Sequence, residues 1–171
     1  MERMSSIQMA IENEKREMQY YMEQATRSNN PVAKLLFETL AADELDHMKR
    51  IRTLHTKLTA DGSWPEDLAI EVEGTNIQTR ITELMQMKDS SKDHDDDDIA
   101  ALEKAAQGEA DGAAFYKDLA ELCDNPQEKK FFGFLAQIER QHLMSIRDSL
   151  FYLQDPESWF EEKDRSSFDG A

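Results

Sequence analysis

The chain alternates apolar and polar residues with the period of packed helices, and it does so twice. From Phe37 onward, core-type positions recur at spacings of three and four residues, the pattern of a helix face that is buried in a bundle. The segment returns 95 residues later, with the matched pairs Phe37/Phe132, Leu40/Leu135, Ala41/Ala136, Glu44/Glu139, His47/His142 and Ile51/Ile146. In both copies, a glutamate and a histidine therefore stand one helical turn apart on a face that should be apolar.

A second pair of segments is related by the same offset. Its matched positions are Ile7/Leu102, Ile11/Ala106, Glu14/Glu109, Met18/Ala113, Tyr21/Tyr116 and Ala25/Ala120. An Asn-Pro pair follows each copy, with the asparagine suited to cap the next helix and the proline to its first position. The pattern predicts helices over about 4–27, from 31 to about 59, over about 99–123 and from 126 to about 153. These are two copies of one helical hairpin.

The connection between the hairpins, about 60–98, is long enough to carry the chain from one end of a bundle to the other. Asp61-Gly62 should end the second helix, Trp64-Pro65 should anchor the connection, and 77–87 should form a short amphipathic helix. The acidic run 93–98 is interpreted as a solvated helix N-terminus, not as a metal cluster.

Beyond Asp155-Pro156 a short tail helix is expected, with Trp159 and Phe160 folded back onto the bundle. The prediction is one all-α domain over 1–171, a four-helix bundle made of two duplicated hairpins. Its repeat halves are about 4–59 and 99–153, its crossover about 60–98 and its tail 154–171.

The charge of the chain narrows the classes of partner. A net charge of −16 and a pI near 4.6 oppose binding to nucleic acid or to anionic membranes. No apolar run reaches the length of about 18 residues that a membrane span needs, so we expect a cytoplasmic protein. The single cysteine, Cys123, excludes an intramolecular disulfide and a Cys-x-x-Cys site; we expect it to be a helix-end residue and not a reactive thiol.

A pseudo-twofold axis between the hairpins would bring the repeated polar residues to one centre. Four carboxylates match the charge of two divalent cations, whereas without a metal they would repel one another and take up protons. Oxygen ligands with one imidazole per metal and no sulfur suit iron or manganese, and zinc less well. The predicted ligands are Glu14, Glu44, His47, Glu109, Glu139 and His142.

These motifs resemble those of the ferritin-like di-iron carboxylate proteins. The two Glu-x-x-His pairs, together with Glu-x6-Tyr at 14–21 and at 109–116, are most similar to the rubrerythrin branch, over residues 4 to about 153. The closing Phe168-Asp169-Gly170 is also similar to stand-alone rubrerythrin-like domains. The resemblance implies a ferritin-like bundle in which the glutamates ligate or bridge two irons, with one iron on each histidine. It also implies that Tyr21 and Tyr116 donate hydrogen bonds to the carboxylates, although both could simply be buried aromatic residues.

Two departures from the family pattern matter. The chain lacks the four cysteines of a rubredoxin domain, so its electrons must come from an external donor such as a rubredoxin-type protein. Rubrerythrins carry an extra glutamate one turn after the third-helix ligand, where this chain has Gly112. The matching place in the first half holds Glu17, which is either an extra ligand or a solvated surface residue.

The function that this resemblance implies is reduction of hydrogen peroxide at a di-iron centre, in a homodimer. One alternative is a ferroxidase or iron-storage protein of the bacterioferritin kind, which reacts with dioxygen. Leu45 stands where that kind has a haem-binding methionine and argues against it. The other alternative is a metal-stabilised structural bundle without turnover.

Overall fold

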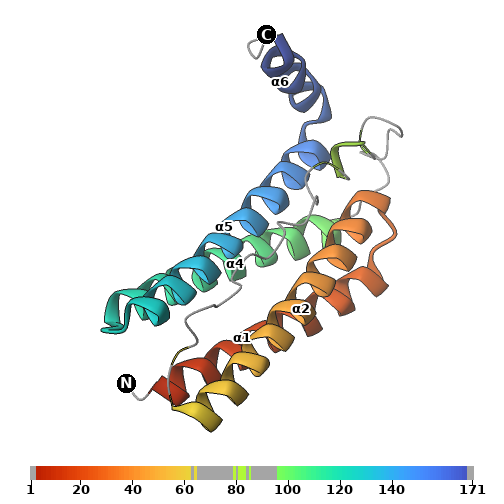
Figure 1. Ribbon diagram of the computed structural model, residues 1–171. Coiled ribbons are helices and arrows are strands. Elements are labelled where there is room, and N and C mark those ends of the chain that lie inside the picture. The colour runs from red at the N-terminus through yellow and green to blue at the C-terminus, as the bar shows by residue number, and fades with distance from the viewer. Residues whose placement is uncertain are drawn as a thin grey trace.

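The computed structural model describes residues 3–62, 64, 79, 81–83, 85 and 96–168. Within them lie the helices α1 (Arg3–Arg27), α2 (Pro31–Asp61), α4 (Asp96–Leu122), α5 (Pro126–Gln154) and α6 (Pro156–Phe168). Figure 1 shows α1 beside α2 and α4 beside α5, as two antiparallel hairpins whose helices form one bundle. The predicted all-α four-helix bundle with a short C-terminal helix is confirmed.

Both hairpins turn through the predicted Asn-Pro pair. The side chain of Asn30 accepts hydrogen bonds from the backbone amides two and three residues further on, at 2.9 and 3.0 Å. Asn125 does the same at 2.8 and 3.2 Å. Pro31 and Pro126 begin α2 and α5, where a helix needs no amide donor. Caps of this kind stabilise a helix by about 1 kcal/mol each.

The second helix ends where the sequence predicts. Gly62 has a φ of 68°, and its amide donates to the Leu58 carbonyl at 2.9 Å. This is the left-handed conformation that favours glycine after a helix. Figure 1 shows that α2 ends at one end of the bundle and that α4 begins at the other. The chain therefore leaves the first hairpin at one end of the bundle and enters the second hairpin at the other end.

Parts of that connection can be compared with the prediction. Residues 79, 81–83 and 85 are helical, within the expected helix 77–87; the rest of that segment, Pro65 and residues 93–95 lie outside the described residues. The expectation of a fully solvated acidic run is wrong at Asp98. Its side chain is 1% exposed and pairs with Arg27, at the end of α1, at 3.1 Å. Cys123 directly follows α4, and its thiol donates to the Leu119 carbonyl.

Apolar side chains fill both ends of the bundle, and the repeat extends further than the helices that predicted it. Trp64 and Trp159 are separated by the same 95 residues, and each belongs to a different apolar cluster. Trp64 packs on Phe131, with ring centroids 5.6 Å apart. Trp159 packs on Tyr152 at 5.3 Å, so the tail helix does fold back onto the bundle. Phe160 contacts the same tyrosine while remaining 36% exposed.

Between the two apolar clusters, the middle of the bundle is polar. No helix of the described residues is long and apolar enough to cross a membrane.

Candidate metal centre

Each of the four bundle helices contributes one buried carboxylate to the middle of the bundle. Glu14, Glu44, Glu109 and Glu139 are 0–1% exposed, and the two histidines are 3–4% exposed. The structure thus brings all six predicted residues into one buried cluster. Ionised groups are almost never buried to this extent without partners, so the cluster needs a chemical explanation.

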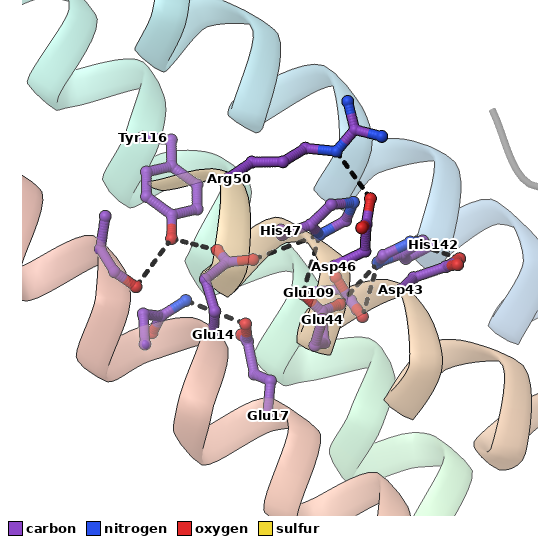
Figure 2. A network of polar contacts seen from close by, with 12 residues as sticks. Glu14, Glu17, Asp43, Glu44, Asp46, His47, Arg50, Glu109, Tyr116 and His142 are labelled. Atoms are coloured by element: carbon purple, nitrogen blue, oxygen red, sulfur yellow. Dashed lines mark hydrogen bonds and ion pairs between the residues drawn. The ribbon is translucent and has the colours of Figure 1, made fainter. Parts of the chain in front are cut away.

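The two histidines turn the same ring nitrogen toward the carboxylates. Nδ1 of His47 lies 3.0 Å from Oε2 of Glu44 and 3.2 Å from Oε2 of Glu14. Nδ1 of His142 lies 3.0 Å from Oε1 of Glu44 and 3.4 Å from Oε1 of Glu109. The rings stack with centroids 5.7 Å apart. Figure 2 shows the resulting chain of contacts, in which the carboxylate of Glu44 contacts both imidazoles.

The two tyrosines connect the hairpins through the same carboxylates. Tyr21, on α1, donates its hydroxyl to Oε1 of Glu109 on α4 at 2.5 Å. Tyr116, on α4, donates to Oε1 of Glu14 on α1 (Figure 2). Both are at most 1% exposed. They are therefore donors to the carboxylates and not merely buried aromatics, while any role in turnover stays a prediction.

Several buried atoms of the cluster lack a hydrogen bond, although buried polar atoms in proteins nearly always have one. They are Oε2 of Glu14, Oε1 of Glu44, Oε2 of Glu109, Oε2 of Glu139 and Nδ1 of His142. Two sets of ligand atoms, each within 4.8 Å of one another, share Glu44: one contains His47 and Glu14, the other His142, Glu109 and Glu139. These donors fit a metal site, and oxygen with imidazole suits iron.

The pKa shifts within the metal-free cluster also indicate a metal site. Burial, and then the charge of Glu44, raise the pKa of Glu14 to about 8. Burial, followed by the charge of Glu109, raises the pKa of Glu139 well above its usual value. Burial would also raise the pKa of Glu44, but His142 and His47 together hold it below its ordinary value. Glu44 therefore favours the charged form, whereas Glu14 and Glu139 hold protons that bound cations would displace.

The histidines hold protons in the metal-free state for the complementary reason. Burial alone would lower the pKa of His47, but the close carboxylates of Glu14 and Glu44, 3.2 and 3.0 Å from its Nδ1, raise it to about 10. His142 is shifted in the same direction, mainly by the charges of Glu109 and Glu44. A metal on either Nδ1 must therefore replace a proton.

Glu17 lies at the rim of the cluster. It is half-buried, and its Oε2 accepts a hydrogen bond from Nδ2 of Asn13 at 3.0 Å. Its Oε1 lies 3.5 Å from where a Cβ on Gly112 would stand, and that Cβ would also be 3.4 Å from Cδ of Glu139. Glu17, Glu14 and Glu139 each offer an oxygen within 4.8 Å of the others. Glu17 therefore stays a candidate ligand, in the space that the repeat-related glycine leaves open.

Asp43 is a further residue at the site, which the repeated motifs did not predict. Its Oδ2 lies 3.5 Å from Nε2 of His142, on the side of the ring away from the cluster, and the residue is 12% exposed. A carboxylate behind a metal-bound imidazole orients the ring and makes it a stronger ligand. The residue that the repeat matches with Asp43 is Ile138, which has no carboxylate. Asp43 could have been found in the sequence from this difference between the two copies of the repeat, directly before the predicted ligand Glu44.

A bundle of two duplicated hairpins, with one glutamate from each helix and Glu-x-x-His on two of them, defines the class of ferritin-like carboxylate proteins that bind a metal pair. The comparison with family models is specific: the rubrerythrin model matches residues 6–150, and again residues 100–167. The chain therefore belongs to the rubrerythrin family. The comparisons with curated proteins and with solved structures found no match.

Proposed function

We propose that the chain is a di-iron peroxidase that reduces hydrogen peroxide to water with electrons from an external donor. The observation that carries the proposal is the buried cluster of four carboxylates and two Nδ1 atoms. Five of its possible metal-ligand atoms have no hydrogen bond. When bound, two ferrous ions would supply the two electrons that, together with two protons, convert hydrogen peroxide to two water molecules, and the donor would return the two electrons. Manganese and zinc would bind the same donors as substitutes.

The residues of the chain prepare this chemistry in distinct ways. Tyr21 and Tyr116 each donate a hydrogen bond from the hydroxyl to a carboxylate oxygen of the opposite hairpin, which fixes the orientation of Glu109 and Glu14. Asp43 orients the ring of His142. The apolar clusters on both sides exclude water, which strengthens every electrostatic interaction within the centre.

The electron donor, the assembly and the location belong to the same proposal. A rubredoxin-type protein is the kind of donor expected, because the chain has one cysteine and cannot form a rubredoxin site of its own. We propose a homodimer that works in the cytoplasm.

Stopped-flow mixing of the anaerobic diferrous protein with hydrogen peroxide and, separately, with dioxygen tests the proposal. We expect peroxide to oxidise the centre faster, with two irons oxidised per peroxide. Glu44→Gln should abolish the reaction by removing the shared ligand. Glu38→Gln is the matched control, because Glu38 lies on the same helix and is exposed.

Two other outcomes would replace the proposal. If dioxygen is the faster oxidant and excess iron accumulates as a mineral, the protein is a ferroxidase of the storage kind. If the metal-loaded protein reacts with neither oxidant and holds zinc as readily as iron, the metal only stabilises the bundle.

A further inference from the structure

A groove of about 720 Å³ runs between α1 and α4. Its walls are the same face of two repeat-related helices, formed by the pairs Met9/Lys104, Asn13/Gly108 and Tyr20/Phe115. The groove also carries both signs of charge, because Arg16 and Lys104 line it together with Glu12, Glu17 and Asp111. It is therefore much closer to neutral than the whole chain, whose net charge is −16.

The groove reaches the metal centre. Tyr21, Glu17 and Gly112 belong to its lining. Tyr21 donates to Glu109, and a Cβ on Gly112 would lie 3.4 Å from Cδ of Glu139. The other side of the centre, between α2 and α5, is covered by the stacked imidazoles, with Asp43 behind one of them. Among the described residues, the path from the groove to the ligands thus passes Glu17 and Gly112.

A difference between the repeats determines what can pass. Glu17 and Gly112 occupy equivalent positions, so one half has a long side chain where the other has none. Around Gly112, the position of an added Cβ has ordinary contacts of 3.4–3.5 Å with Glu139 and with Oε1 of Glu17. The gap has room for a methyl group, and a branched side chain would overfill it. Asn13, one turn earlier on the same helix, donates a hydrogen bond of 3.0 Å to Oε2 of Glu17 and so fixes this carboxylate beside the gap.

We propose that this groove is the entrance through which the oxidant reaches the centre, that Glu17 is its gate, and that the gap at Gly112 limits entry to molecules of the size of hydrogen peroxide. Bulky organic hydroperoxides are excluded. This inference rests on the proposed function. A neutral oxidant suits the groove, because an anion would meet the repulsion of the whole chain.

The test measures entry without turnover. Nitric oxide is small and neutral, and its binding to the anaerobic diferrous protein is followed by absorbance in a stopped-flow instrument. Gly112→Leu should slow binding about tenfold, which is the effect of an added barrier comparable to a typical overpacking strain. Gly133→Leu is the matched control, because Gly133 is exposed on α5, is not part of the groove lining and has no neighbour within 4 Å of an added Cβ.

Removal of the gate should have the opposite effect. Glu17→Ala should speed nitric oxide binding several-fold and should raise the rate with cumene hydroperoxide relative to hydrogen peroxide. Glu12→Ala is its control, since Glu12 lines the same groove from an exposed position. Iron content is measured for every variant.

The possible results distinguish a failure of the proposed entrance from a failure of the proposed peroxidase function. Equal nitric oxide rates in the wild type and in Gly112→Leu, with both irons present, would overturn the entrance alone. Loss of an iron in Glu17→Ala would show that Glu17 is a ligand and would overturn the gate. A wild-type chain that takes up no iron would overturn both the metal centre and the entrance. Slow oxidation by peroxide, combined with the expected order of nitric oxide rates, would overturn only the peroxidase.

Discussion

Removing the metal should make the stability of this protein fall as the pH rises from 5 to 8. The pKa of Glu14 is about 8 in the metal-free fold, against an ordinary value of 4.5. Between these values the folded chain holds a proton that the unfolded chain has lost, so rising pH favours unfolding. One such proton changes the free energy of unfolding by about 1.4 kcal/mol per pH unit. From pH 5 to pH 7, the titration of Glu14 alone therefore lowers the free energy of unfolding by roughly 3 kcal/mol.

The neighbours of Glu14 act in the same direction. Glu139 has a raised pKa mainly because it is buried. His47 stays protonated up to about pH 10 in the fold, against an ordinary value of 6.5, and His142 is also raised. The stability that these protons contribute is present at low pH and is lost as the pH rises through the folded pKa. Glu44, with its lowered pKa, has the opposite sign, but it titrates below this window.

Thermal melts followed by circular dichroism at pH 5, 6, 7 and 8 test the prediction on protein stripped by a chelator. For a domain of this size, a loss of 3 kcal/mol corresponds to a Tm lower by about 6–12 °C at pH 7 than at pH 5. Glu14→Gln removes one of the titrating groups and should flatten the profile, whereas the exposed Glu38→Gln should leave it unchanged. Metal-free Tm values that rise steadily from pH 5 to pH 8 would refute the reasoning.

Three further predictions follow from the same structure. Asp43→Asn should lower the affinity for one of the two metals by about tenfold or more, because only one imidazole loses its supporting carboxylate. Calorimetric titration with Mn²⁺ should then resolve two unequal sites. An equal loss of affinity at both sites would contradict the assignment. Trp159→Ala should cost about 3–5 kcal/mol in urea unfolding, whereas Phe160→Ala, at a residue that is 36% exposed, should cost clearly less. Similar costs would show that the tail packs differently. Replacing all four centre glutamates by glutamine should abolish metal binding, yet leave a fold at least as stable at pH 7 as the metal-free wild type, because glutamine needs no proton in order to be buried. A less stable variant would show that the carboxylates stabilise the fold even without metal.

The helices and the six central residues could be predicted because their signals are local and are repeated. Asn30 caps its helix through amides two and three residues away, and Asn125 repeats the geometry. The spacing that places Glu44 and His47 on one helix face also follows from helical periodicity alone. The repeat then matches these faces between the two halves.

Other features depend on contacts between hairpins that no local pattern records. Asp98 is buried because Arg27, 71 residues away in the chain, pairs with it. Asp43 contacts His142, which lies on the other hairpin. Glu17 likewise approaches Gly112 on α4, since its Oε1 lies 3.5 Å from where a Cβ on that glycine would stand. In each case, the informative residue is one at which the two halves of the repeat differ or fail to match.

The number and spacing of bound metals test the di-metal centre most directly. Protein loaded anaerobically with ferrous iron should contain two irons per chain by elemental analysis, because two sets of ligand atoms share Glu44. X-ray absorption spectroscopy should then show an iron–iron distance of about 3–4 Å, as in two-metal sites in general. A single iron per chain, with His142 left without a metal, would contradict this account and would show that the repeated glutamates and histidines are merely architectural.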